Sequence, residues 1–236
     1  MRWTIAALVA ALAWPVLAAA EDVEAVMLLY QRQDGGGPAY PSRFLVTPEY
    51  MRIDSGETEG DYVLFDRKKG VIHSVTHQDG SVLEIRPHEV AVEAPVELNL
   101  SQERTDQGDM PPVGGTVPER HLLRANDRRC YEVVAVPGLL EAAVEARREY
   151  RRVLAGEHAR GVNALPADMQ DVCNLATHTF APVRHLAYGL PIQERGHDGF
   201  SRTLMDYDRA VEVDAALFTL PEGYVHYAPG ETRERQ

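Results

Sequence analysis

The chain has 236 residues, of which 44% are hydrophobic, and its 24 basic and 36 acidic residues give a formal net charge of −12. Such a charge repels nucleic acids and anionic lipid surfaces at long range, so we expect no nucleic-acid partner. A chain of this length can bury most of its unfolded surface in one core, which makes a single large domain the default expectation.

The first twenty residues have the pattern of a secretory signal peptide. Arg2 gives a basic start, residues 5–17 are mostly apolar, and residues 18–20 are alanines of the kind found at cleavage sites. A membrane anchor is the alternative, but the apolar run is short and contains Pro15. We therefore expect cleavage near Ala20, a periplasmic location, and no transmembrane segment after cleavage.

The first half of the remaining chain is predicted to be rich in strands. Asp79-Gly80 is a strong signal for a two-residue hairpin turn. Residues 89–101, EVAVEAPVELNLS, alternate apolar and polar side chains, which predicts a strand with one buried and one exposed face. Before them, five segments combine β-branched and aromatic residues with flanking turns, namely 23–31, 43–55, 61–67, 71–78 and 81–87.

The second half mixes strands with a helical stretch. A hairpin is expected to turn at Asn126-Asp127, and strands return after about residue 184 with a turn at residues 197–199. Between them, residues 139–158 and 166–180 place apolar side chains at helical spacing, with Gly156 as a plausible end of the first helix. Near the end of the chain, Leu217, Phe218 and Leu220 are expected to tuck into the core.

These elements predict an α+β fold. We expect a curved antiparallel sheet, an unclosed β-barrel, with a helical insertion over about residues 138–180 that covers the open side. The single domain is expected to span residues 21–228, followed by a polar tail over residues 229–236.

The chain has two cysteines, Cys130 and Cys173. In an exported protein two cysteines most simply pair with each other, so we expect a disulfide bond between them. A nucleophilic pair of Cys173 and His178 is the alternative, but an oxidising compartment argues against a free thiolate.

The sequence contains no nucleophile elbow, phosphate loop, dinucleotide fingerprint or zinc-protease helix, so we expect no catalytic residues and no cofactor. The stretch GHDGFS brings His197, Asp198 and Ser201 close along the chain, but a catalytic triad is defined by spatial geometry. The protein is therefore expected not to be an enzyme.

One hairpin face offers an alternative metal site. With a two-residue turn at Asp79-Gly80, His73, His77 and Glu84 fall on the same side of the hairpin, and Glu84 lies diagonal to both histidines. Imidazole and carboxylate ligands suit zinc or copper. The other interpretation is an ordinary solvated sheet face, since Arg86 would lie opposite His73 and repel a cation.

The first predicted helix carries a basic stripe in this acidic chain. A phosphate or an acidic partner is one interpretation, and ion pairing with Glu145, Glu149 and other acidic groups is the other. The stripe consists of Arg147, Arg148, Arg151 and Arg152.

Two stretches carry a resemblance to a known family. The strand-rich RFLVTPEYMRIDSG…DYVLFDRKKGVIHSVTHQDGSVLEI and the closing YDRAVEVDAALFTLPEGY resemble the periplasmic lipoprotein-carrier superfamily (LolA/LolB-like). The resemblance implies a strongly curved, unclosed antiparallel barrel with helices as a lid over an apolar cavity. It also implies binding of acyl chains or other apolar ligands, or a role as an envelope sensor or chaperone. The chain departs from the carriers in an insert of about 40 residues between its cysteines.

We therefore expect a non-enzymatic periplasmic protein that binds a lipid or other apolar ligand, or an envelope protein partner, in a cavity between sheet and helices. One alternative is a metal-binding envelope protein that uses the His73, His77 and Glu84 face. Another is a structural or interaction module with a filled core. The predicted cavity-lining residues are Val92, Val96, Leu98, Leu140, Val144 and Met169.

Overall fold

The structure is a computed structural model that describes residues 22–57, 59–105, 110–164, 166 and 169–231. The expected signal peptide, residues 1–20, lies outside the described residues. The strands are β1 (Asp22–Gln33), β2 (Tyr40–Val46), β3 (Tyr50–Asp54), β4 (Tyr62–Asp66), β5 (Val71–Thr76), β6 (Ser81–Ile85), β7 (Leu100–Thr105), β8 (Glu119–Ala125), β9 (Arg128–Val136), β10 (Leu190–Gly196), β11 (Ser201–Asp214) and β12 (Val225–Tyr227). The helices are α1 (Glu141–Arg160), α2 (Val172–Asn174), a π-helical turn at Leu175–Phe180 and 3₁₀ turns at Val162–Ala164, Arg184–Leu186 and Ala215–Phe218.

All twelve of these strands join in one sheet, in the order β12-β6-β5-β4-β3-β2-β1-β11-β10-β9-β8-β7. Every neighbouring pair is antiparallel except β12 and β6, which run parallel. The expectation of a purely antiparallel sheet is therefore wrong. β11 lies between β1 and β10 in this order. The chain that follows it packs Phe218 against the sheet and then returns beside β6, where the backbone N–H of Val225 donates to the carbonyl of Gly80.

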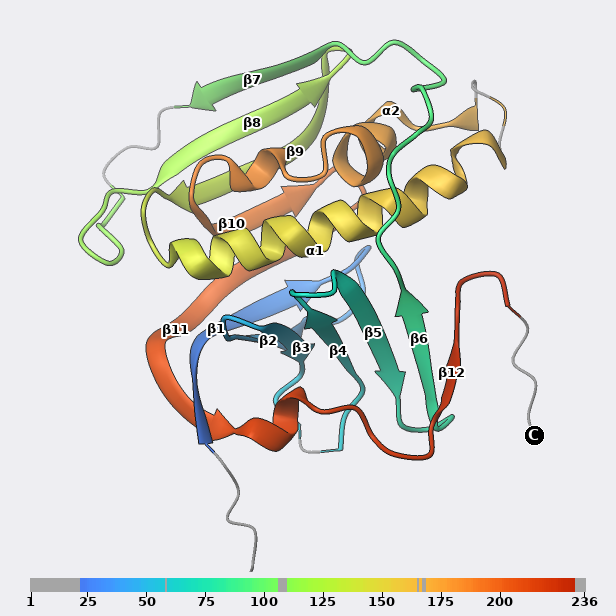
Figure 1. The fold of residues 1–236 in the computed structure, drawn as a ribbon. Coiled ribbons are helices and arrows are strands. Elements are labelled where there is room, and N and C mark those ends of the chain that lie inside the picture. The colour runs from blue at the N-terminus through green and yellow to red at the C-terminus, as the bar shows by residue number, and fades with distance from the viewer. Residues whose placement is uncertain (1–21, 58, 106–109, 165, 167–168, 232–236) are drawn as a thin grey trace, which may run out of the picture.

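The sheet bends around α1, which crosses its concave side (Figure 1). The bend follows β1 and β11, whose pairing shifts register twice, between Ala25 and Met27 and between Leu29 and Tyr30. Such bulges increase local twist and curvature. The main core fills the space under the helix with side chains from both halves of the sheet and from α1, and includes Leu28, Phe65, Val134, Ala143, Val144 and Leu190.

The helical insertion is smaller than the sequence indicates, which corrects the expected fold class. The helix expected over residues 166–180 is reduced to α2 and the π-helical turn, so α1 is the only long helix among the described residues. Twelve strands, rather than a helical cover over a barrel, dominate the architecture. The physical reason lies at residue 171, where Asp171 caps α2 by accepting from two backbone N–H groups and Cys173 is bonded to β9.

The prediction of a strand over residues 89–101 is also wrong. The chain between β6 and β7 crosses over α1 without pairing, and β7 begins only at Leu100 (Figure 1). The alternation of apolar and polar residues in this segment matches an alternation in solvent exposure. Val92, Val96 and Leu98 are half-buried, while the glutamates between them are exposed. A segment laid over a helix needs the same two-sided pattern as a strand, and the pattern alone does not distinguish the two.

The crossing segment also explains why the helix does not end at Gly156. A side chain at position 156 would meet the backbone oxygen of His88 at 2.2 Å, so only glycine fits where the segment passes. The helix continues to Arg160. Gly156 is thus a contact point inside α1 rather than a stop signal.

A second apolar cluster lies on the opposite face of the sheet. Val75, Val82 and Tyr62 pack there against Phe218, with Leu217 and Leu220 partly buried beside it. The expectation that the end of the chain tucks into the core is confirmed. The hairpin predicted at Asn126-Asp127 is confirmed as well, because both residues adopt positive φ between the paired β8 and β9.

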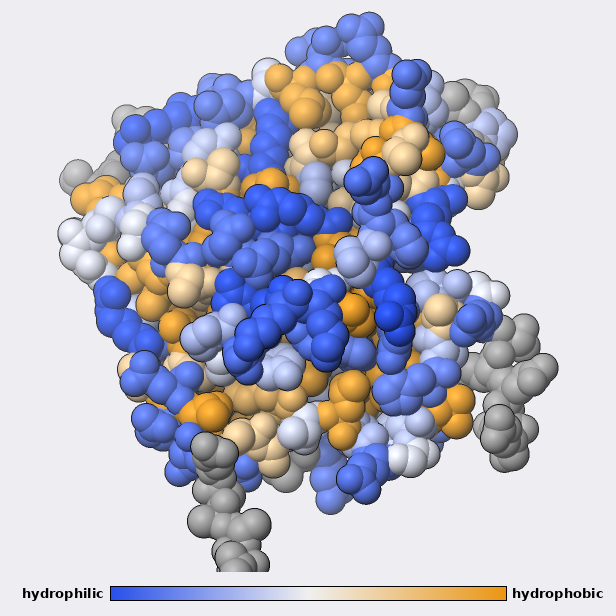
Figure 2. All heavy atoms as spheres, in the orientation of Figure 1, coloured by the Kyte–Doolittle hydropathy of each residue, from blue (hydrophilic) through white to orange (hydrophobic). Residues whose placement is uncertain are grey.

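The outward side of α1 is hydrophilic, as the band of polar side chains across the middle of Figure 2 shows. No helix among the described residues is long and apolar enough to cross a membrane.

Candidate functional site

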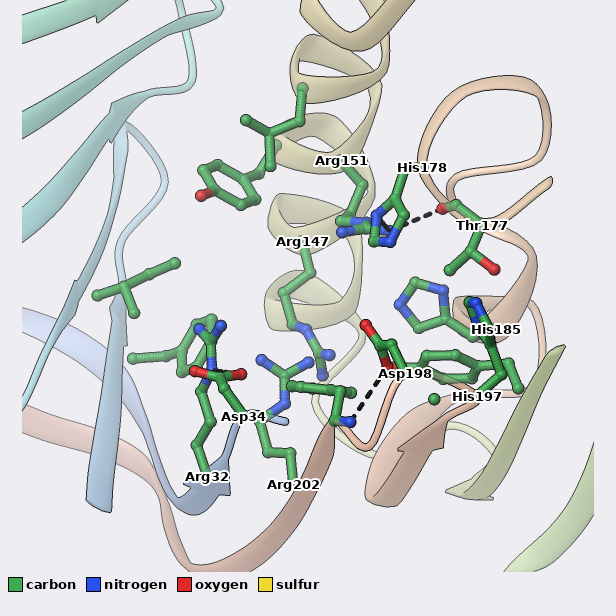
Figure 3. A pocket seen from close by; sticks show the side chains of 17 residues that line it. Arg32, Asp34, Arg147, Arg151, Thr177, His178, His185, His197, Asp198 and Arg202 are labelled. Carbon is green, nitrogen blue, oxygen red and sulfur yellow. Dashed lines mark hydrogen bonds and ion pairs between the residues drawn. The ribbon is translucent and has the colours of Figure 1, made fainter. Parts of the chain in front are cut away.

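A cavity of about 270 Å³ lies between α1 and the bend of the sheet (Figure 3). The helix contributes Arg147, Tyr150, Arg151 and Leu154, which share one face because they are three or four residues apart. The strands and the π-helical turn supply the remaining walls. Sequence segments up to about 170 residues apart therefore meet at this site.

Glu194 of β10 has a fully buried side chain and lies behind the cavity wall, where it contacts the lining residues Arg147 and Arg202. Its carboxylate accepts from Arg147 Nη2 at 3.0 and 3.1 Å and from Arg202 Nε at 2.7 Å. Tyr131 donates its hydroxyl to the same carboxylate at 2.9 Å. Two guanidinium groups thus share one buried negative charge.

Burial and these contacts shift the pKa values of Glu194 and of the neighbouring His185. Burial by itself would raise the pKa of Glu194, but Arg147 and Arg202 outweigh it and hold that pKa well below its usual range. Burial lowers the pKa of His185 well below its usual value, although Glu194 lies 3.7 Å away. At neutral pH the carboxylate is therefore ionised and the imidazole is neutral.

Arg151 reaches the cavity from one turn further along α1. Its Nη2 donates to the carbonyl of Thr177 at 2.8 Å and its Nε to the carbonyl of Pro182 at 3.3 Å. Its Nη2 also lies 3.5 Å from Nδ1 of His178. Burial, with help from Arg151, lowers the pKa of His178 to about 4, so this histidine is neutral at pH 7.

The cavity has an apolar part as well. Phe44, Ile53, Tyr150, Leu154 and Phe200 line it from β2, β3, α1 and the residue just before β11. Aromatic and aliphatic side chains beside a few charged groups are typical of pockets that bind small organic molecules. The arrangement can hold a molecule that is apolar at one end and polar at the other.

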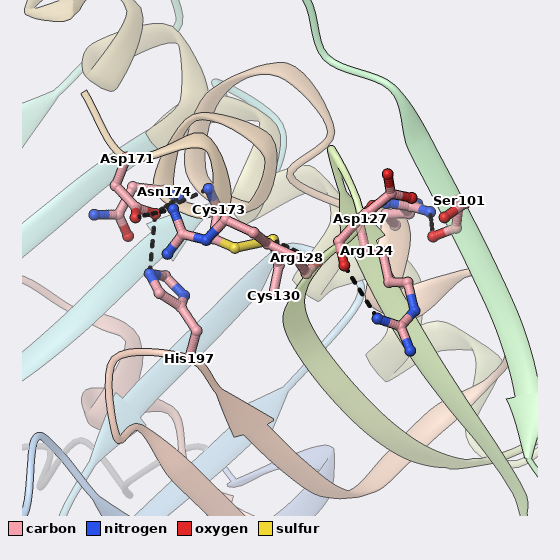
Figure 4. The surroundings of a disulfide bond; sticks show 10 residues. Ser101, Arg124, Asp127, Arg128, Cys130, Asp171, Cys173, Asn174 and His197 are labelled. Atoms are coloured by element: carbon pink, nitrogen blue, oxygen red, sulfur yellow. Dashed lines mark hydrogen bonds and ion pairs between the residues drawn. A yellow bond between two sulfur atoms is a disulfide. The ribbon is translucent and has the colours of Figure 1, made fainter. Parts of the chain in front are cut away.

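The disulfide bond predicted between Cys130 and Cys173 is confirmed (Figure 4), with Cα atoms 4.9 Å apart. It joins β9 to α2, just before the π-helical turn that brings Thr177 and His178 to the cavity. Asp171 reinforces the junction through ion pairs with Arg128 at 2.8 Å and His197 at 3.1 Å. One wall of the cavity is therefore fixed covalently to the sheet.

The residues predicted to line a cavity do not meet at this one. Leu140 and Val144 are buried in the main core beneath α1, and Met169 is 68% exposed. The other three lie on the segment that crosses α1 and are half-buried there, namely Val92, Val96 and Leu98. Only the four lining residues of α1 follow a helical period, and no signal in the sequence joined them to the rest of the lining, which comes from separate elements.

The alternative metal site is not assembled. His73 lies directly opposite Glu84, with Nδ1 and Oε1 3.9 Å apart, because Thr76 pairs with Ser81 and the turn has four residues rather than two. His77 instead contacts the hydroxyl of Tyr224 at 2.7 Å.

Within the described ranges, the group of metal-ligating side chains close enough to share an ion is Asp171, Cys173 and His197. The sulfur of Cys173 is in the disulfide bond, which removes it both as a thiolate ligand and as a nucleophile beside His178. His197 pairs with Asp171, so the GHDGFS stretch does not form a triad.

The basic stripe of α1 divides into two sets. Arg148 and Arg152 pair with Glu145 at 3.1 Å on the outer side of the helix, where ion pairing is the correct interpretation. Arg147 and Arg151 turn inward to the cavity.

No family model and no curated protein matches the chain. Among solved structures it is similar to an uncharacterised conserved protein from Thermus thermophilus, with a TM-score of 0.44 and 8% identity over 86% of this chain and 90% of that chain. It is also similar to PNGF-II, with a TM-score of 0.40 and 8% identity, covering 87% of this chain and 31% of that chain. The chain thus spans about a third of the PNGF-II chain.

Proposed function

We propose that this is a non-enzymatic binding protein that holds a small apolar or amphipathic molecule in the cavity between α1 and the sheet. The observation that carries the proposal is the apolar lining of Phe44, Ile53, Tyr150 and Leu154 along a cavity of about 270 Å³ that also carries charged groups. Such a lining lets a small molecule bury its apolar part while a few polar groups fix its orientation.

The size of the cavity limits the ligand. Pockets for small molecules usually measure roughly 300–1,000 Å³, so this cavity fits a small amphiphile rather than a whole phospholipid. A neighbouring hollow of about 310 Å³ shares Arg32 and Ile53 with it, which gives a longer molecule room to extend. The proposal agrees with the apolar-ligand binding that the lipoprotein-carrier resemblance implies.

We further propose that the protein works in the periplasm, after cleavage near Ala20. The start of the chain supports an exported protein, and the disulfide bond is in keeping with an oxidising compartment. An envelope protein is the alternative partner.

The first test is titration with N-phenyl-1-naphthylamine, a neutral apolar dye whose emission rises in dry sites. We expect saturable binding of one dye molecule per protein. Leu154→Trp should weaken this binding at least tenfold, because the indole fills the apolar part of the cavity.

The matched control is Arg152→Trp, which places the same indole on the exposed side of the same helix, where Arg152 is 55% exposed. It should leave dye binding unchanged. Both tryptophans of the chain, Trp3 and Trp14, precede the expected cleavage site, so the new indole would report its own environment by its emission wavelength. Wild-type protein that does not bind the dye, or a Leu154→Trp variant that binds it normally, would contradict the proposal.

A further inference from the structure

The inner wall of the cavity carries an excess of positive charge. Arg147 and Arg202 share the single carboxylate of Glu194, and Arg151 adds a third guanidinium. Three positive charges against one negative charge leave two without a counter-ion on this wall, in a chain whose formal net charge is −12. The histidines beside them add no charge at neutral pH, because burial lowers the pKa of His178 and His185.

The two carboxylates that line the cavity, Asp34 and Asp198, do not neutralise the wall. Asp34 is exposed and is already paired with Arg32 at 3.0 Å. Asp198 is exposed as well, and its Oδ1 accepts from the backbone N–H of Phe200 at 3.1 Å. Water and salt screen such exposed charges more strongly than they screen the buried guanidinium groups.

Arg151 is the member of the wall whose charge is least compensated. Its contacts are two backbone carbonyls and the neutral imidazole of His178, made through Nε and Nη2, and Nη1 makes none of them. No ion pair joins Arg151 to a carboxylate anywhere in the described part of the chain. Arg151 is half-buried, so its guanidinium keeps an open side on which an anion from outside the chain can pair with it.

We infer that the ligand of the cavity is an amphiphile with one anionic group, a carboxylate or a phosphate, that pairs with Arg151 while its apolar part lies against Phe44, Ile53 and Leu154. The inference rests on the proposed function, since it requires a cavity that takes up an apolar group. A guanidinium group presents paired donors that match both kinds of anion. His178 offers a second donor, because an Nδ1 that accepts from Arg151 leaves the proton on Nε2.

The test compares three probes that share an eight-carbon chain, namely octanoate, octyl phosphate and octan-1-ol. Each is titrated against the full chain loaded with N-phenyl-1-naphthylamine at pH 7.5 and low salt. We expect octanoate or octyl phosphate to displace the dye at a concentration at least tenfold lower than octan-1-ol. Whichever anion is stronger identifies the headgroup, and the advantage should shrink as salt is added.

The variants locate the anion. Arg151→Gln should remove the advantage of the anions over the alcohol while the neutral dye still binds. Arg151→Lys, which retains the positive charge, should keep part of the advantage of the anions over the alcohol. The matched control is Arg152→Gln, whose exposed side chain pairs with Glu145 and which should keep the full advantage.

The outcomes separate the inference from the function on which it rests. If the dye binds and the alcohol displaces it as well as the anions do, the inference is overturned and the proposed function stands. If the dye does not bind to the wild-type protein, both the proposed function and the inference are contradicted. An anion preference that survives in Arg151→Gln overturns the assignment to Arg151. Should that variant fail to fold, the comparison of probes on wild-type protein and on Arg151→Lys still decides the matter.

Discussion

At the scale of single residues, Glu194 balances the charge of two arginines that line the cavity. It is a buried carboxylate between two buried guanidinium groups, and neither Arg147 nor Arg202 has another ion-pair partner among the described residues. Removing one member of such a cluster leaves the others buried and uncompensated, which costs more than the pair itself contributes. The stability of the fold is therefore highly sensitive to substitutions in this cluster.

We predict that Glu194→Gln lowers the free energy of unfolding by about 3–5 kcal/mol, because it leaves two positive charges without their carboxylate. Urea unfolding followed by far-UV circular dichroism measures the change. Glu157→Gln is the control, since it removes one carboxylate from an i,i+3 surface pair with Arg160 and should cost no more than about 1 kcal/mol. An equal effect of the two substitutions would contradict the prediction.

The same carboxylate gives a dependence on pH. Because the folded-state pKa of Glu194 is depressed, its stabilisation is present above the ordinary glutamate pKa of about 4.3 and is lost as the pH falls below it. The unfolding free energy of Glu194→Gln should accordingly fall less steeply than that of the wild type below that pH.

At the scale of elements, the contact between α1 and the segment that crosses it decides which residue is tolerated at position 156. In an exposed helix, replacing glycine with alanine stabilises by about 1 kcal/mol. Here the added Cβ would lie 2.2 Å from the oxygen of His88, which is backbone and cannot rotate away.

We predict that Gly156→Ala destabilises the protein by about 1–3 kcal/mol, the usual cost of overpacking, and so reverses the sign expected from helix propensity. Gly161→Ala is the matched control at the end of the same helix, where a Cβ would meet its nearest neighbour at 3.6 Å. That substitution should stabilise by about 0.4–1 kcal/mol. Thermal melts of the two variants beside the wild type check both signs, and a stabilised Gly156→Ala would disprove the packing of the crossing segment.

The elements also show why local patterns succeeded in some places and failed in others. The turn at Asn126-Asp127 was predictable because positive φ at two successive residues is a local demand that few residue types meet. The pattern of residues 89–101 wrongly predicted a strand. Alternation shows only which side of a segment is apolar, whereas a strand also requires a partner strand to pair with. The turn at Asp79-Gly80 lies where the pattern placed it, but its length set a register two residues away from the expected one.

At the scale of the whole molecule, the disulfide bond closes a stretch of 43 residues that contains α1 and ends at the wall carrying Thr177 and His178. On the chain-entropy model a loop of that length contributes about 4 kcal/mol. The bond therefore both stabilises the fold and holds one wall of the cavity against the sheet.

We predict that the Cys130→Ala/Cys173→Ala variant melts roughly 8–16 °C below the oxidised wild type, from about 4 kcal/mol and 2–4 °C per kcal/mol for a chain of this size. Differential scanning calorimetry measures the shift. Wild-type protein treated with reductant is the control and should approach the variant. A variant that melts with the oxidised wild type would show that the bond contributes nothing to stability.

What the sequence by itself determined is what depends on local chemistry or on counting. It predicted the disulfide bond from two cysteines, the tight turn of β8 and β9, and the buried end of the chain around Phe218. It also showed which arginines of α1 were candidates for an anion. Each of these follows from residue types or short spacing, which do not change when the chain folds.

Only the tertiary structure decided the cavity, its charge and the parallel return of β12. Arg151 and Arg148 are equivalent in the sequence, yet one turns toward the sheet without a counter-ion and the other pairs with Glu145 on the surface. Glu194 stands between Gln193 and Arg195 in β10, and nothing local distinguishes it as the buried member of this polar run. Burial and counter-ions depend on which distant segments meet, and that is set by the packing of the whole sheet around α1.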